Sequence, residues 1–234
     1  MSAFVLKIIA IISMTFDHMS YLIFGEFSFM NYIGRIAFPI FAYQITEGYI
    51  HTHNLKKYFF RLFIFSLISQ IPFMLFSSLL SDEISLNIFF TLLLGLGAIT
   101  IYDALNKIEC KNKITHISYN LIGLAGVCLF AFLANIARCD YGYFGVLIIF
   151  LFYLFRNKKL LMNATFIAMV FIYYGQRLLF STAYIPYLLI IIFTIFPLLF
   201  INLYNHKKGK DTKYFLYIFY PLHLLIIYGL SFLQ

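Results

Sequence analysis

The sequence predicts an all-α protein, a polytopic bundle of about nine transmembrane helices with a cytoplasmic N-terminus. Of the 234 residues, 63% are hydrophobic and 11% are charged, and the mean hydropathy is +0.91, whereas about a quarter of the residues in a soluble domain are charged. Apolar runs of about 20 residues recur along the whole chain, and each is long enough to cross a hydrocarbon layer roughly 30 Å thick. These two observations exclude a soluble fold.

Hydropathy and charge together place nine spans and a single domain over residues 1–234, because no linker or repeat divides the chain. The first run is interpreted as a retained helix and not a signal peptide, since no small-residue cleavage site follows its apolar core. The sixth span is short, which suits a tilted or partial crossing, and Pro39 predicts a kink inside the second. The spans cover residues 4–24, 30–50, 58–79, 86–103, 117–136, 141–155, 160–179, 184–203 and 214–232.

The net charge of +8 reports orientation in such a chain, because cytoplasmic loops collect Lys and Arg. With an inner N-terminus, fourteen of the 17 Lys and Arg residues fall on the cytoplasmic side, and the exceptions are Arg35, Arg138 and Arg177. We therefore expect a multi-pass protein of the cell (cytoplasmic) membrane, with the lipid bilayer as partner and no nucleic acid. The three cysteines lack ligand spacing, so we expect no metal, and an oligomer stays open.

Ionisable side chains within the spans mark candidate sites, because inserting each costs at least about 2.5 kcal/mol. At about 1.5 Å per residue, Asp17, His18 and Arg35 lie at a similar depth. Further polar groups on other spans lie near the same level, which predicts one cavity in the outer half of the membrane. These groups are Gln70, Asn87 and His223.

The chemistry expected of this cavity follows from helix geometry. Adjacent residues point about 100° apart, so Asp17 pairs with Arg35 and leaves His18 free. A neutral imidazole is the base that acyl transfer from a thioester requires, and Arg35 or Asn87 would stabilise the oxyanion. In the alternative interpretation, the ion pair only fixes helix packing and the histidines only bridge helices.

Two basic loops at the inner rim predict a site for a polyanion such as coenzyme A, although positive-inside topology and anionic lipid explain them as well. Glu47, near the inner end of the second span, is expected to pair with loop cations. The first loop contributes His51, Lys56, Lys57 and Arg61, and the second contributes Lys207, Lys208 and Lys213.

Several stretches carry a resemblance that runs in order over nearly the whole chain. They read LKIIAIISMTFDH from Leu6, IGRIAFPIFAYQITEGYIHT from Ile33, YFFRLFIFSLISQIPF from Tyr58, NIFFTLLLG, DYGYFG, LYNHKKG and KYFLYIFYPLHLL. Together they resemble the TraX family of membrane proteins, and the Asp-His pair followed by Gly-Arg-x-x-Phe-Pro is the most specific part. His206 departs from the glycine of a Tyr-Asn-Gly-type turn.

The resemblance implies an acetyltransferase, related to the membrane acyltransferase superfamily, that uses cytoplasmic acetyl-CoA as co-substrate. The acceptor would be a protein N-terminus, such as the pilin associated with the family's namesake, an envelope glycan or a small molecule. Transfer through a covalent acetyl-histidine or directly stays open. His18 matches the catalytic histidine, and the other motif positions are Asp17, Arg35, Glu47, His51, Arg61, Asn87, Asp140, Lys213, Tyr220 and His223.

Two rival classes explain the same topology. A secondary transporter or channel would also place an Asp, a His and an Arg inside a bundle. A scaffold without chemistry accounts for the spans but not for three such groups at one depth.

Overall fold

The computed structural model describes residues 1–24, 27–81, 83–109, 112–180, 184–210 and 214–233, apart from the side chains of residues 176, 177 and 180. This part of the chain is all-helical, with one isolated bridge between Leu86 and Cys139. The helices are α1 (Ala3–Phe24), α2 (Phe29–Gly34), α3 (Ala37–His51), α4 (Leu55–Ser77), α5 (Ile88–Asn106), α6 (Lys113–Ile136), α7 (Gly142–Leu154), α8 (Lys159–Phe180), α9 (Tyr184–Ile195), α10 (Pro197–Asn202), α11 (Phe215–Leu230) and the short 3-10 helix η1 (Ser231–Leu233).

The all-helical prediction is confirmed for the described residues, while the predicted count of about nine spans is not confirmed. Six stretches of the described chain are long and apolar enough to cross a membrane: Ala3–Phe24, Leu55–Ser77, Ile88–Asn106, Lys113–Ile136, Tyr184–Asn202 and Phe215–Leu233. The predicted sixth and seventh spans form shorter apolar helices, Gly142–Leu154 and Lys159–Gly175. The predicted second span is not one helix but two, α2 and α3.

The break between α2 and α3 lies at Arg35 and Ile36, and Arg35 is the residue whose carbonyl the predicted kink at Pro39 would leave without a helical partner. The backbone N–H groups of Arg35 and Ile36 donate to carbonyls three residues back, Tyr32 and Ile33, at 3.1 Å each. Such bonds tighten the last turn of a helix. Since α3 begins at Ala37, Pro39 occupies its first turn, where a backbone N–H has no partner within the helix and its loss costs little.

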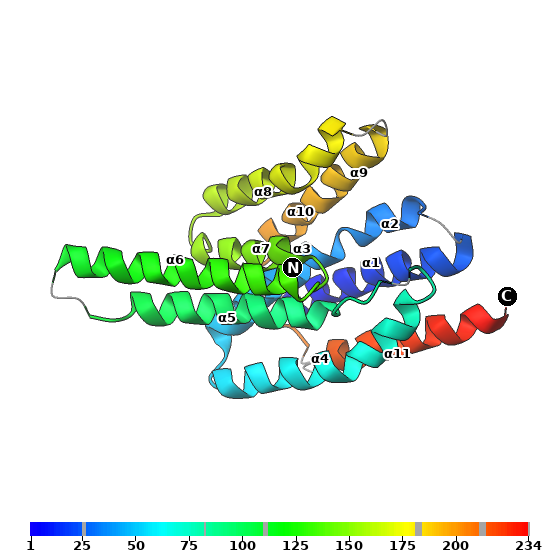
Figure 1. Cartoon of the computed structure of the whole chain (residues 1–234), viewed down its shortest axis with the longest axis horizontal. Coiled ribbons are helices and arrows are strands. Elements are labelled where there is room, and N and C mark those ends of the chain that lie inside the picture. Colours follow the sequence, from blue (N-terminus) through cyan, green and yellow to red (C-terminus); the bar gives the residue numbers. More distant parts are fainter. Residues whose placement is uncertain (25–26, 82, 110–111, 181–183, 211–213, 234) are drawn as a thin grey trace.

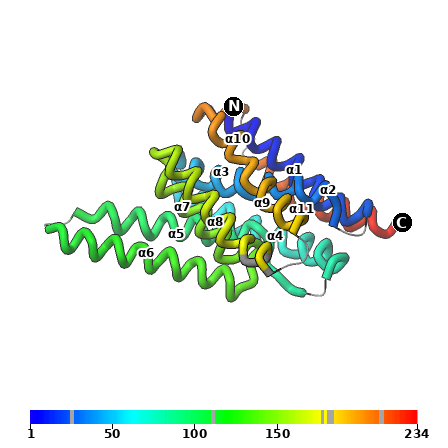
Figure 2. The backbone as a smooth tube through the Cα atoms, turned by 90° about the horizontal axis from the view of Figure 1, so that it is seen from above, coloured from blue at the N-terminus to red at the C-terminus, as the bar shows by residue number. Residues whose placement is uncertain are grey.

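The core of the bundle lies where α1, α3, α5 and α7 meet. Leu6, Ile40, Leu96, Ile148 and Phe152 are fully buried there. Figure 1 shows α4 and α11 along one side of this core and α8 and α9 along the other, and in Figures 1 and 2 α5 and α6 run side by side beyond the rest of the bundle.

One long face of α6 has no protein neighbour among the described residues. Ile114, Leu121 and Phe132 on this helix are at least 60% exposed. Contiguous exposed apolar side chains of this size are typical of a surface that faces lipid.

The loops group into the two sets that the charge pattern predicts. At one end, the N-terminal segment is hydrogen-bonded to the second basic loop: the N–H groups of Ala3 and Phe4 donate to the carbonyls of Lys207 and Lys208 at 2.9 and 3.1 Å. At the other end, the α4–α5 and α6–α7 connections are joined by a bond of 3.0 Å from the N–H of Leu86 to the carbonyl of Arg138. The orientation of these two ends across a membrane stays a prediction.

Gly34, the last residue of α2, allows α2 to approach α1 closely. A Cβ atom built at Gly34 would lie 2.4 Å from Cβ and 2.5 Å from Cγ of Asp17. These distances are far inside van der Waals contact, so only glycine fits between the two helices.

Gly34→Ala is expected to lower stability by about 1–3 kcal/mol, the usual cost of overpacking, because Asp17 or α2 must move. Unfolding of detergent-solubilised protein, followed by circular dichroism, measures the effect. Gly175→Ala in α8 is the matched control, since nothing lies within 4 Å of its added Cβ, and helix propensity there favours alanine by about 0.5–1 kcal/mol. Equal stability of the two variants would contradict the close approach.

Candidate functional site

Asp17 and His18 are neighbours on α1, and the structure directs them toward different helices, as predicted. Asp17 faces the break between α2 and α3, where Nη2 of Arg35 donates to its Oδ1 and Oδ2 at 3.2 and 3.3 Å. The two side chains are 17% and 21% exposed. The predicted Asp17–Arg35 pair is therefore confirmed as a contact.

Asn31 orients both members of this pair, and the sequence analysis did not single it out. Its Nδ2 donates to Asp17 Oδ1 at 2.8 Å, and its backbone carbonyl accepts from Nε of Arg35 at 3.2 Å. Its Oδ1 accepts from the Ser20 hydroxyl and from the backbone N–H of Ser28, both at 2.7 Å. Asn31 has no exposed surface, and its place three residues after the N-cap Ser28 was the available signal.

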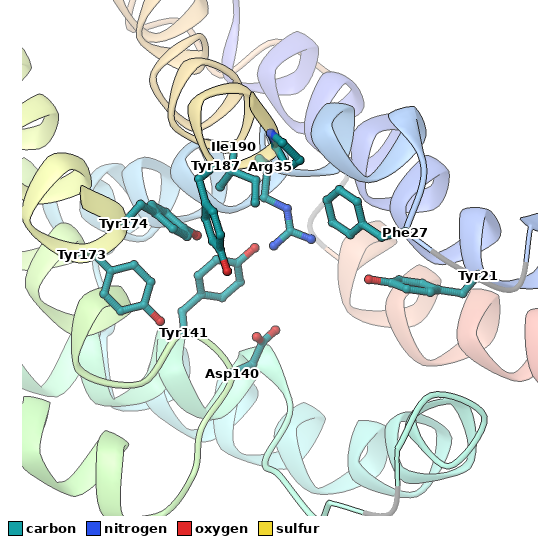
Figure 3. Close-up of a pocket in the computed structure, with 10 residues that line it drawn as sticks. Tyr21, Phe27, Arg35, Asp140, Tyr141, Tyr173, Tyr174, Tyr187 and Ile190 are labelled. Atoms are coloured by element: carbon teal, nitrogen blue, oxygen red, sulfur yellow. The ribbon is translucent and has the colours of Figure 1, made fainter. Parts of the chain in front are cut away.

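A cavity of about 500 Å³ opens on the α2 side of α1, at the ends of α1, α8 and α9. Figure 3 shows the Arg35 guanidinium and the Asp140 carboxylate directed into it, with tyrosine side chains around them. The lining residues are Tyr21, Phe27, Arg35, Asp140, Tyr141, Tyr173, Tyr174, Pro186, Tyr187 and Ile190. We call this cavity the tyrosine pocket.

Asp140 and Tyr141 reach the tyrosine pocket from the strained connection between α6 and α7. Arg138, Tyr141 and Gly142 have φ angles of 50°, 63° and 46°, a left-handed conformation that is uncommon outside glycine. The backbone N–H of Asp140 donates to the carbonyl of Leu86 at 2.8 Å, and the Tyr141 ring stacks on Phe38 at 3.9 Å between centroids. These contacts hold a conformation that the chain would otherwise avoid, as is common at functional sites.

Burial raises the pKa of the Asp140 carboxyl to about 6. The Arg35 guanidinium lowers the pKa of Asp140, and the nearby Asp17 carboxylate raises it. Burial outweighs the attraction of Arg35, because Arg35 is already neutralised by Asp17. Asp140 therefore changes its charge near neutral pH inside the tyrosine pocket.

A second cavity of about 320 Å³ adjoins the tyrosine pocket. Tyr141 and Tyr173 line both cavities. The second cavity continues to Glu83, Ser85 and Arg138. Each cavity thus combines tyrosine rings with charged groups.

His18 lies outside the tyrosine pocket, and the prediction that it stands free is wrong. Its Nδ1 lies 2.7 Å from Nε2 of His223 on α11, and its ring packs on Phe76 of α4 at 4.9 Å between centroids. Since α1 separates this side from the α2 side, the single predicted cavity is in fact two sites that flank α1. Tyr21, one turn beyond His18 on α1, lines the tyrosine pocket.

Gln70 and Asn87 belong to neither site, so the predicted oxyanion role of Asn87 is wrong. Oε1 of Gln70 accepts from the backbone N–H and from Nδ2 of Asn87, at 3.1 and 2.9 Å. Nδ2 of Asn87 also donates to the carbonyl of Ser66 at 2.8 Å, and its Oδ1 caps α5 by accepting from the N–H of Phe89. These bonds leave Asn87 Nδ2 no proton for a substrate. The pair instead joins α4 to the start of α5.

Tyr220 also lies away from the tyrosine pocket. It is buried against Phe89, with ring centroids 5.1 Å apart, and against His223 at 5.6 Å. It helps to enclose His223.

The two predicted donor loops meet at Glu47, whose carboxylate lies near one histidine of each loop. Oε2 of Glu47 lies 3.5 Å from His51 Nε2 in the first loop and 3.7 Å from His206 Nδ1 in the second. His206 has a φ of 57°, the conformation that glycine favours, which explains why a turn of this kind otherwise carries glycine.

The cations around this junction are arranged differently from one another. Lys56, Lys57 and Lys207 are exposed, and Lys208 follows in the same loop. Arg61 is held between the rings of Tyr58 and Tyr217, 5.3 Å from each centroid, and its Nε is buried without a hydrogen-bond partner among the described residues. Lys213 lies outside the described residues. The two-loop arrangement predicted for a polyanion is thus present in part.

A further cluster at this end was not predicted. The carboxylate of Asp103 on α5 accepts from the Tyr49 hydroxyl at 2.6 Å, from the Tyr153 hydroxyl and from Lys107 Nζ at 2.6 Å. It joins the ends of α3, α5 and α7. A lone carboxylate in a basic segment gave no sign of these tyrosine partners in the sequence.

Removing one member of the Asp17–Arg35 pair is expected to lower the free energy of unfolding more than removing both members. Arg35→Gln leaves a carboxylate without its cation, and we expect a loss of about 3 kcal/mol, near the lower end for buried pairs because both side chains are partly exposed. Asp17→Asn combined with Arg35→Gln should recover part of this loss. A double-mutant cycle in mixed micelles, with unfolding followed by circular dichroism, measures the coupling energy of the pair. Strictly additive losses of stability in the two single variants would contradict the predicted coupling.

The Asp140 carboxyl is expected to titrate with a midpoint near pH 6, so that it is protonated at pH 5 and ionised at pH 7.5. Carbon-13 NMR of protein labelled at aspartate carboxyls measures this transition, and Asp140→Asn identifies its signal. Arg35→Gln should raise the midpoint, since it removes the cation that favours the ionised form. A midpoint near 4 in the wild type would show that the carboxyl is solvated.

Comparison with known proteins gives the context for these sites. The family model described as TraX protein matches residues 2–231. The probable fimbrial assembly protein FimC of Dichelobacter nodosus is 30% identical, over 97% of this chain and 94% of the relative. An uncharacterized protein of Rickettsia prowazekii (strain Madrid E) is also 30% identical, over 66% of this chain and 56% of the relative. No solved structure matches the chain. Since the family model covers nearly every residue, the chain belongs to the TraX family.

Proposed function

We propose that this chain is a membrane-embedded acetyltransferase that moves an acetyl group from cytoplasmic acetyl-CoA to an acceptor. The reactive end of the acceptor would lie at His18, and the tyrosine pocket on the other side of α1 would hold another part of it. The observation that carries the proposal is a histidine inside the bundle whose Nε2 has no hydrogen-bond partner among the described residues, one helical turn from a polar cavity. The motif that places this histidine beside Asp17 supports it, as does membership of the TraX family.

The reaction assigns a distinct task to each group. Nε2 of His18 takes the proton of the acceptor's amine or hydroxyl while the acceptor atom bonds to the carbonyl carbon of the thioester. The carbon–sulfur bond then breaks, the thiolate leaves, and His18 returns the proton to give free coenzyme A. Arg35 lines the tyrosine pocket on the other side of α1, so it would bind an acceptor group there and would not contact the oxyanion.

The donor would enter at the junction of the two basic loops. Lys56, Lys57 and Lys207 are exposed there and suit the phosphates of coenzyme A. Arg61, with its partnerless buried Nε, lies one to two turns further into α4, in the direction of Phe76 and His18. The pantetheine arm would follow this path between α4 and α11.

The acceptor is proposed to be larger than the tyrosine pocket. The second cavity shares Tyr141 and Tyr173 with it, so an extended acceptor segment would occupy both. A protein end or an envelope glycan has this form, and a fimbrial component agrees with the name of the relative from Dichelobacter nodosus, a probable fimbrial assembly protein. A small metabolite would leave the second cavity empty.

Donor binding and donor turnover in detergent test the proposal against transport. We expect purified protein to bind acetyl-CoA and release its thiol, and His18→Ala to keep the binding but lose about 10²–10⁴-fold in rate, the usual contribution of a general base. Calorimetry and chromatographic detection of free coenzyme A provide the two measurements. His116→Ala, at an exposed histidine at the start of α6, is the matched control.

Two outcomes would reject the enzyme. An equal rate of thiol release in wild type and His18→Ala would contradict the role of His18 as the base. Absence of acetyl-CoA binding in both proteins would contradict its role as the donor. Detergent micelles hold no gradient, so turnover there cannot come from transport. Substrate accumulation in vesicles without acetyl-CoA would instead favour the transporter, which a His18–His223 proton path would also suit.

A further inference from the structure

The histidine pair between α1 and α11 forms a directed chain of hydrogen bonds. Nδ1 of His223 lies 3.0 Å from the carbonyl oxygen of Phe219, and Nε2 of His223 lies 2.7 Å from Nδ1 of His18. A carbonyl oxygen only accepts hydrogen bonds, so Nδ1 of His223 must carry a proton. In a neutral imidazole the other nitrogen is then an acceptor.

The direction of the first bond decides the second. Because Nε2 of His223 accepts, Nδ1 of His18 must donate to it. The proton of neutral His18 therefore sits on Nδ1, and its lone pair is on Nε2. Both rings are neutral at rest, since an imidazolium at this depth would be a charge without a carboxylate partner.

The surroundings hold His223 in this orientation. Its side chain is buried, with only 5% of the residue exposed. Its ring stacks on Phe219 at 5.0 Å between centroids and 10° between planes, and packs against Tyr220 at 5.6 Å. The planes of the His18 and His223 rings are 15° apart. A ring rotation would break both bonds of His223, and neither Phe219 nor Phe76 offers a side-chain replacement.

The remaining nitrogen of His18 has no assigned partner. Among the described residues, no group hydrogen-bonds to its Nε2. An unprotonated nitrogen that is held in place and has no other partner is suited to accept a proton.

We propose that His223 is a positioning residue that selects the tautomer of His18 in which Nε2 carries the lone pair. The inference rests on the proposed function, in which this nitrogen takes the acceptor's proton. The same hydrogen bond also matters after His18 has taken the proton, because protonated His18 donates a charge-assisted hydrogen bond from Nδ1 to Nε2 of His223. The transient cation is thereby stabilised without a nearby carboxylate.

Substitutions at His223 separate this role from simple packing. His223→Gln places an amide oxygen where Nε2 was, so it can still accept the proton of His18 Nδ1. His223→Leu fills similar space but offers no acceptor. The two variants are therefore matched for burial and differ in the hydrogen bond.

Nitrogen-15 NMR of histidine-labelled protein reports the tautomer directly, and His18→Gln identifies the His18 signals. We expect wild type and His223→Gln to show a protonated Nδ1 and an unprotonated Nε2 on His18, and His223→Leu to show protonated Nε2 in most molecules. Donor turnover should fall at least about tenfold in His223→Leu and stay within about threefold in His223→Gln, since a base held in the wrong tautomer can lose up to about 10⁴-fold.

The NMR spectra test the tautomer of His18, and donor turnover tests the proposed function, so each can fail without the other. A wild-type spectrum with the proton on His18 Nε2 overturns the inference even if no variant can be purified. An unchanged His18 tautomer in His223→Leu overturns it as well, while turnover in wild type would leave the proposed function intact. The expected spectra without turnover in any form would retain tautomer selection and reject the enzymatic role that it was proposed to serve.

Discussion

The ion pair of Asp17 with Arg35 is the contact on which the arrangement of both sites depends. Two opposite charges inside a bundle persist only with good geometry and further hydrogen bonds, and Asn31 supplies those bonds to both partners. The pair needs α2 to end at Arg35 and to lie against α1 without a side chain at Gly34. It therefore accounts for the break in the second predicted span and for the rotation of α1 about its axis.

That rotation decides what the two faces of α1 carry. With Asp17 directed to α2, the next residue is turned about 100° away, toward α4 and α11, where His223 receives it. The face with Arg35 opens into the tyrosine pocket, which is polar, aromatic and partly charged. The other face has a neutral imidazole pair enclosed by Phe76, Phe219 and Tyr220. The tyrosine pocket and the histidine pair thus lie on opposite sides of one helix.

Polar groups elsewhere in the bundle hold helices together. Gln70 and Asn87 join α4 to α5, Asp103 joins α3, α5 and α7, and Glu47 lies where two basic loops meet. Their hydrogen bonds are directed at protein atoms, whereas Arg35 and Asp140 face a cavity. The two groups therefore differ in what each side chain faces.

The sequence by itself determined the helical class, the order of the segments, the grouping of the loops and the partner of Asp17. Each of these follows from composition or from the rise per residue along a helix, which any single helix encodes. Tertiary structure alone decided that His18 meets His223, 205 residues away, that Asn31 orients the ion pair, and that one expected cavity is two sites. Depth is a property of one helix, but rotation and neighbours depend on the packing of every helix at once, and no local pattern in the sequence records them.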